Sequence, residues 1–111
     1  MAVHDDKTIF KNFTSDTESD TLHVTREGVL VLDAARNAGD ITLSLQIKAT
    51  SGGTYVQARD ASGDAITANI SSSLPHWHVE FVMQSGMYYK VVGTDASSAN
   101  VDCRFGRATA Y

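Results

Sequence analysis

The sequence predicts an all-β fold, an antiparallel, jelly-roll-like β-sandwich with about seven to eight short strands. Apolar residues alternate with polar residues in short runs, as they do in strands with one buried face. The runs recur about every 10 residues and are separated by turns rich in glycine and serine. Only one short stretch has the composition of a helix, so little helix is expected.

The first two predicted strands, residues 22–24 and 29–32, flank a turn at Glu27 and Gly28. The helix candidate follows directly, over residues 32–38, and is closed by a glycine. Its length allows at most one helical turn.

The next strands alternate more regularly. In residues 41–47 every second residue is isoleucine or leucine, and the residues between them are threonine, serine and glutamine. This is the period-2 pattern of a half-buried strand. Turns at residues 51–53 and 61–64 then delimit predicted strands over residues 54–59 and 65–70.

The last three predicted strands cover residues 77–83, 87–92 and 101–105. The first of them places Trp77 and its alternating apolar neighbours toward the core, and the polar residues between them toward solvent. The only proline, Pro75, precedes this strand, where a missing backbone donor disturbs no ladder.

Residues 1–20 are predicted to form an extended polar arm ahead of a β-sandwich domain over residues 21–111. The arm is crowded with charged and hydroxyl side chains, but it contains an apolar group, Ile9, Phe10 and Phe13. One interpretation makes this group an edge strand or turn packed on the domain. The other makes it an anchor that orders only against a partner, which gives the candidate partner-binding residues Ile9, Phe10 and Phe13.

Composition limits the classes of function. The chain has 9 basic and 13 acidic residues, a balance that argues against binding to nucleic acid or to an anionic membrane. Its N-terminus lacks a basic stretch followed by an apolar one, so no signal peptide is predicted and synthesis in the cytoplasm is expected. The single cysteine, Cys103, cannot form an intramolecular disulfide and is expected to be a small buried apolar residue.

The strongest candidate for chemistry is the row His76, His78 and Glu80 on one face of a predicted strand. Such a row extends over ~13 Å, too far to converge on a metal without help from another strand. The sequence also lacks a nucleophile elbow, a phosphate-binding glycine loop and a zinc-protease helix motif. We therefore expect no enzymatic activity, no metal and no cofactor.

Two segments together resemble a known family. Residues 51–60 read as a strand that ends in a hairpin, and residues 85–96 contain the run Gly-Met-Tyr-Tyr-Lys-Val ahead of the strand 101–105. In this order the segments resemble the small β-sandwich decoration proteins, also called cement or staple proteins, on the heads of tailed bacteriophages. The resemblance to this family covers about residues 41–107, and the length of the chain and its N-terminal arm are similar to those of the capsid-stapling protein of one group of short-tailed phages.

The resemblance implies a virion structural protein, made in the host cytoplasm, that binds the outer capsid surface and bridges subunits of the major capsid protein. It further implies a homo-oligomer, a dimer, on the capsid, and no catalytic residues. The alternative is a carbohydrate-binding β-sandwich module of a virion or tail. Trp77 separates the two, because an exposed ring favours sugar binding and a buried ring favours the structural role.

Overall fold

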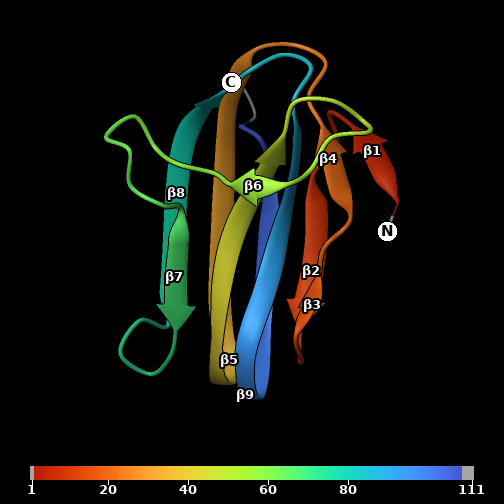
Figure 1. Ribbon diagram of the computed structural model, residues 1–111. Coiled ribbons are helices and arrows are strands. Elements are labelled where there is room, and N and C mark those ends of the chain that lie inside the picture. Colours follow the sequence, from red (N-terminus) through yellow and green to blue (C-terminus); the bar gives the residue numbers. More distant parts are fainter. Residues whose placement is uncertain (1, 109–111) are drawn as a thin grey trace.

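The computed structural model describes residues 2–108, and this part of the chain forms strands and no helix (Figure 1). The predicted all-β fold is thereby confirmed. In chain order the nine strands are β1 (Val3–Asp5), β2 (Ile9–Phe13), β3 (Thr17–Glu18), β4 (Thr21–His23), β5 (Gly28–Lys48), β6 (Val56–Gln57), β7 (Thr67–Ile70), β8 (His76–Met83) and β9 (Tyr88–Arg107).

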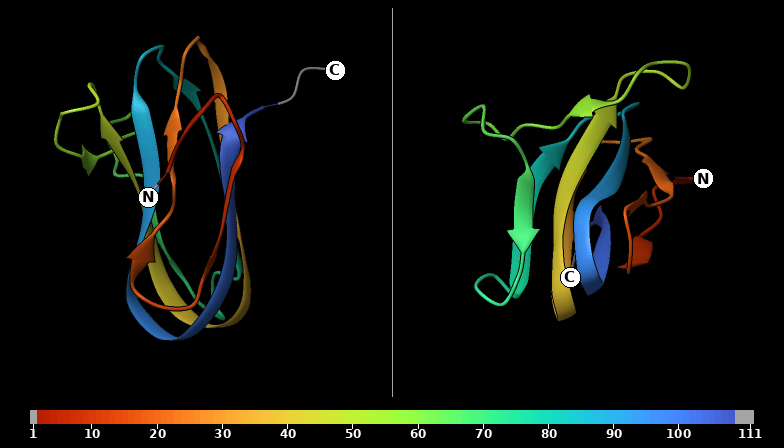
Figure 2. Two further views of the ribbon diagram at one scale, coloured as in Figure 1. Left: turned by 90° about the vertical axis from the view of Figure 1, so that its right-hand side faces the viewer. Right: turned by 60° about the horizontal axis from the view of Figure 1, so that its bottom comes forward.

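Two long strands organise the molecule. β5 has 21 residues and β9 has 20, and the two pair antiparallel over nearly their whole length. The register of this pair shifts three times between Arg36 and Thr42, and the ribbon folds over at this point. Gly39 and Asp95 adopt positive φ there, of 66° and 56°. The folded ribbon therefore contributes a central pair of strands to each of two layers (Figure 2).

The pairing defines both layers of the sandwich. In the first layer, β8 pairs with residues 28–35 of β5, which pair with residues 101–107 of β9, which pair with β2. In the second layer, β7 and β6 pair with the end of β5, and β3 and β4 pair with the start of β9. β1 is added parallel to β4, so the architecture is a jelly-roll-like sandwich with one parallel pair.

Alternate residues of the central strands fill the space between the layers. The inward-facing side chains of these central strands all pack into one core. The largest fully buried side chains are Tyr89, Phe13, Phe105, Leu22, Leu30, Leu32, Ile41, Leu43, Leu45, Ile70, Met83 and Val24.

The structure differs from the sequence prediction over residues 32–38, which are strand throughout rather than a helical turn. Leu32 and Ala34 continue the inward alternation of β5, and their burial outweighs the weak helical preference of a short alanine-containing stretch. The same continuity merges predicted short strands into β5, and others into β9.

Residues 3–18 pair with the sandwich, as in the first of the two interpretations, which makes the apolar group an edge strand packed on the domain. Within the described part, β2 pairs with β9 over five residues and β3 pairs with β9 over two. Ile9 and Phe13 belong to the common core. The segment is ordered by pairing with the sandwich, because β2 covers the edge of the first layer and buries two large apolar side chains there.

Candidate interaction face

The outward side of the first layer is the candidate functional site, and we refer to it as the outer face. Register places its side chains in rows that cross the strands. The central row is His78, Asp33, Arg104 and Phe10, contributed by β8, β5, β9 and β2 in turn. Each strand of the row is paired in unbroken register with its neighbour, so the row is held on a stiff scaffold.

Asp33 is the hub of the row. Its Oδ1 lies 2.6 Å from Nδ1 of His78 and 3.7 Å from Nε2 of His76, and its Oδ2 lies 3.8 Å from Nη2 of Arg104. The hydrogen bond to Asp33 is the main reason that the pKa of His78 is raised, and Glu80 contributes in the same direction. The face therefore presents interspersed positive and negative groups.

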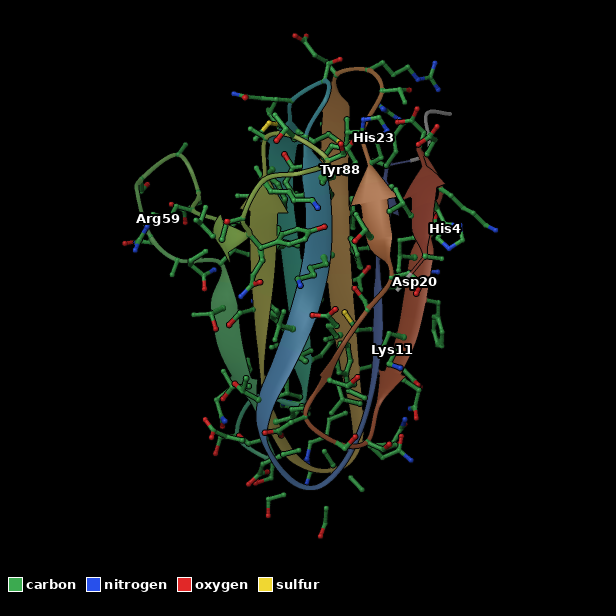
Figure 3. All side chains as sticks on the ribbon, turned by 45° about the vertical axis from the view of Figure 1, so that its right-hand side comes forward. His4, Lys11, Asp20, His23, Arg59 and Tyr88 are labelled. Atoms are coloured by element: carbon green, nitrogen blue, oxygen red, sulfur yellow. The ribbon has the colours of Figure 1, made fainter. Side chains whose placement is uncertain are left out.

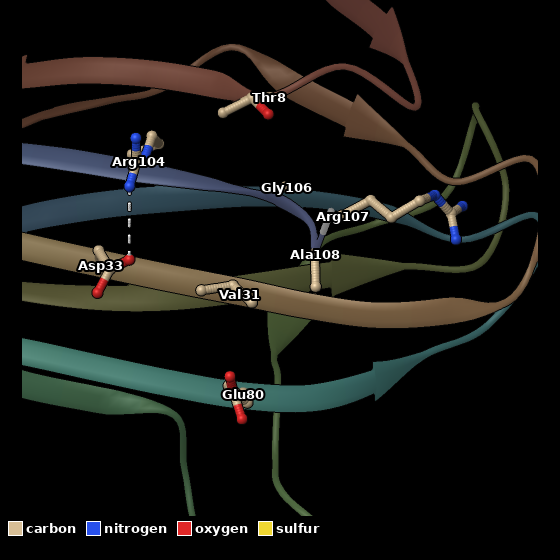
Figure 4. A pocket seen from close by; sticks show the side chains of 8 residues that line it. All are labelled: Thr8, Val31, Asp33, Glu80, Arg104, Gly106, Arg107 and Ala108. Atoms are coloured by element: carbon tan, nitrogen blue, oxygen red, sulfur yellow. Dashed lines mark ion pairs between the residues drawn. The ribbon is translucent and has the colours of Figure 1, made fainter. Parts of the chain in front are cut away.

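Two shallow hollows flank this charged row. One lies beside Gly106 of β9, between Val31 and Thr8, and a Cβ on Gly106 would come within 2.9 Å of the Thr8 Cα (Figure 4). The other lies between Phe10 and His76, and its floor includes Ala35. Gly106 is itself buried and lets Thr8 approach β9 closely, whereas Ala35 is exposed and leaves room in the second hollow for a side chain of a partner.

Exposed apolar side chains also lie on the outer face, and one of them, Phe10, borders the second hollow. Phe10 is 63% exposed, Val82 is 74% exposed and Val29 is 43% exposed. All three lie on the outward side of the first layer, and Val29 pairs directly with Val82. Exposed apolar residues interleaved with charges are typical of a protein–protein interface rather than of a catalytic pocket.

The structure separates the three candidate partner-binding residues. Ile9 and Phe13 point inward and are buried among core side chains of this chain, whereas Phe10 points outward. This separation follows from the alternation of side chains along β2. Residues 9 and 13 are an even number of positions apart and face the same side, whereas residue 10 is an odd number of positions from each of them and faces the opposite side. Of the three, only Phe10 is available to a partner on the folded domain.

The row His76, His78 and Glu80 is outward-facing, as its alternation predicts. A neighbouring strand does supply a further carboxylate, Asp33, next to both histidines. Nevertheless, no group of three or more His, Cys, Asp or Glu residues within residues 2–108 has the arrangement to hold a metal ion. The described chain also contains no helix that is long and apolar enough to cross a membrane.

Aromatic residues on the second layer are engaged with neighbouring side chains. The rings of Tyr88 and His23 stack at 4.3 Å, and these two residues lie side by side in Figure 3. Lys90 and Lys48 place their ammonium groups 4.2 and 4.8 Å from the centre of the Tyr55 ring. In the first layer, Trp77 of β8 is half-buried and packs against the core. Ring faces occupied in this way are poor platforms for stacking a sugar.

Sequence reasoning missed the polar contacts that attach the N-terminal strands. Nε2 of His4, on β1, lies 3.0 Å from Asp20, which directly precedes β4 (Figure 3). Nδ1 of His23, on β4, lies 2.9 Å from Asp5 on β1. No local spacing signals such pairs, because each depends on the parallel register of β1 and β4.

Cys103 is buried, as expected, on the inward side of β9. Burial raises the pKa of its thiol to about 12, and the nearby charge of Asp33 adds to this effect. The thiol is therefore un-ionised at neutral pH and a poor nucleophile.

Comparison with known proteins identifies no family. No family model matches the sequence, and no curated protein matches it. Among solved structures, the chain is similar to Eiger TNF from S. frugiperda, with 9% sequence identity and a TM-score of 0.42. This match covers 93% of the chain and 88% of the TNF chain.

Proposed function

We propose that this protein is a non-enzymatic structural protein of a tailed-bacteriophage head. It binds the outside of the capsid and stabilises it by bridging subunits of the major capsid protein. The resemblance of residues 51–60 and 85–96 to decoration proteins supports the class of protein. The outer face supports the mode of action, because it offers a stiff surface with exposed apolar groups for protein contact.

The observation that most favours binding through the outer face is the position of Phe10. Its ring is 63% exposed, it borders a hollow, and its neighbour across the strands is Arg104. An aromatic residue beside an arginine is the composition enriched at interface hot spots. A dimer that contacts two capsid subunits would bury one such ring in each contact. The two contacts together would hold the dimer more tightly than either contact alone.

Phe10→Ala tests this function. Heads that lack the protein are mixed with wild type or variant, and bound protein is measured by co-sedimentation, followed by the heat resistance of the decorated heads. Loss of one buried ring is worth ~1.5–3 kcal/mol, so we expect at least about a tenfold weaker binding.

Val56→Ala provides the matched control, because Val56 is 59% exposed but lies on β6 of the other layer. This variant is expected to bind heads like wild type. If wild-type protein ignores heads and instead binds a defined sugar on a glycan array, the carbohydrate-binding alternative replaces the capsid proposal. The half-buried position of Trp77 weighs against that outcome.

A further inference from the structure

β8 forms one margin of the first layer and has a free edge. Arg36 donates a backbone hydrogen bond of 2.8 Å to the carbonyl of Pro75, so odd-numbered residues of β8 bond to β5. The N–H and C=O groups of His78, Glu80 and Val82 therefore point away from β5. Within residues 2–108, no other segment pairs with these groups.

The inward side chains of β8 are incompletely covered at the same edge. Trp77, Val79 and Phe81 pack on the core but each is only half-buried, unlike the inward rows of the central strands. Close by, a groove of about 560 Å³ separates residues 59–62 from residues 80–82 of β8. Figure 3 shows that the loop around Arg59 projects away from the body of the sandwich.

The opposite margin of the layer is protected. β2 has only five residues, and Lys11 lies at an inward position between Ile9 and Phe13. An inward lysine on an edge strand discourages the addition of another strand. β8 has eight residues in unbroken register with β5, and it contains no lysine, proline or bulge.

We propose that the free edge of β8 accepts an extended strand of the capsid subunit, which continues the first layer by β-augmentation. This assignment rests on the proposed capsid-binding function and specifies its chemistry. Only a strand presents donors and acceptors at the spacing of the free groups of β8. Its alternate residues are apolar and cover Trp77, Val79 and Phe81, and a basic residue lies opposite Glu80.

Glu80→Pro tests the proposal by removing an edge N–H that faces away from β5. Proline is tolerated at such a position, so the melting temperature should stay close to that of wild type. Binding to heads that lack the protein should weaken about tenfold, because one backbone hydrogen bond is lost and the strands are kept apart. Glu80→Gln retains the N–H and should lose much less.

Val79→Pro is the structural counterpart, because the N–H of Val79 faces β5. This variant should melt at a clearly lower temperature, which would verify the assignment of the free edge. Equal binding by Glu80→Pro and wild type would overturn the strand-addition proposal while leaving capsid binding intact. Failure of wild type to bind heads would overturn both.

Amide hydrogen exchange of the wild-type protein gives a second readout that needs no variant. On binding to heads, the amides of His78, Glu80 and Val82 should become at least tenfold slower to exchange. Unchanged exchange at all three amides in the bound state would overturn the proposal, since an added strand must engage them.

Discussion

At the scale of single residues, Asp6 and Arg107 attach the N-terminal turn to the far end of the chain. Nη2 of Arg107 donates to Asp6 at 3.0 Å, and the backbone N–H of Thr25 donates to the same carboxylate at 3.0 Å. The hydroxyl of Thr25 also donates to Asp6, and this bond is the main reason that the pKa of Asp6 is lowered to about 2.

The neighbouring glycine belongs to the same arrangement. Arg107 donates to the carbonyls of Arg26 and Glu27 at 2.6 Å each, which brings its guanidinium group over Gly28. A Cβ on Gly28 would lie 2.0 Å from Nη1 of Arg107. Glycine is therefore needed here for the close approach of the arginine rather than for an unusual backbone angle.

We predict that Asp6→Asn lowers the free energy of unfolding at neutral pH by about 1–2 kcal/mol, because charge-assisted hydrogen bonds are replaced by weaker ones. Asparagine tolerates the left-handed conformation of residue 6, whose φ is 46°, so backbone strain should not contribute. Urea unfolding at pH 7 measures the change. Asp95→Asn is the control, because Asp95 is exposed and also has positive φ.

The same carboxylate gives a pH dependence of defined sign. The folded pKa of Asp6 is depressed, so its contribution is present above the unfolded pKa of about 3.9 and is lost as pH falls through about 2. Wild type and Asp6→Asn should therefore converge in stability over this interval. A stability difference that persists undiminished at pH 2 would contradict the assignment.

At the scale of elements, β2 shows how alternation distributes neighbouring aromatic residues to different tasks. Phe13 is fully buried, and the ring lies so close to β9 that a Cβ on Gly93 would be 2.8 Å from its Cδ1. Phe10, three residues earlier, is on the outer face. Composition alone groups these residues as one apolar anchor, whereas strand geometry assigns one to folding and one to contact.

We predict that Phe13→Ala lowers the free energy of unfolding by ~3–5 kcal/mol, the usual cost of emptying a phenylalanine site in a core. Phe10→Ala should change stability by no more than about 0.5 kcal/mol, because its ring is exposed. Chemical denaturation of the two variants in parallel makes the comparison. Similar losses in both would mean that β2 does not have the orientation described.

At the scale of the whole molecule, local sequence patterns were sufficient to predict where strands lie. They were not sufficient to predict which of the predicted strands are parts of one continuous strand. Alternation from Ile41 to Ile47 predicts a strand that is present. The same reasoning divides β5 into separate pieces, because Gly39 resembles a terminator. In the folded chain it is a bend within a continuous ribbon, which is decided by pairing between distant residues.

In the candidate site, too, some features follow from local sequence and others depend on pairing between distant residues. The outward position of His78 and Glu80 follows from period-2 alternation within one strand. Their partner Asp33 does not, because it is 45 residues away from His78 and is brought beside it by the register of β5 and β8. The spacing of residues in a single sequence does not show how two distant strands align. Neither the central row nor the hollows beside it could therefore be predicted.

The boundary predicted at residue 20 can be tested on the whole domain. Deletion of residues 1–20 would remove β1, β2 and β3 together, and with them the core side chains Ile9 and Phe13. Burial of each is worth ~1.5–3 kcal/mol, and the edge of β9 would lose its pairing as well. A domain of this size has a total stability of only about 5–15 kcal/mol.

We therefore predict that the chain truncated to residues 21–111 loses most of its stability and its cooperative unfolding transition. Removal of residues 1–5 alone is the control, because it takes away β1 but leaves β2 and the Asp6–Arg107 pair in place. That shorter deletion should melt cooperatively at a moderately reduced temperature. Circular dichroism during heating measures both variants. If residues 21–111 instead melt in a sharp transition near that of the full chain, the N-terminal segment is a separable arm, and Ile9 and Phe13 become available to a partner after all.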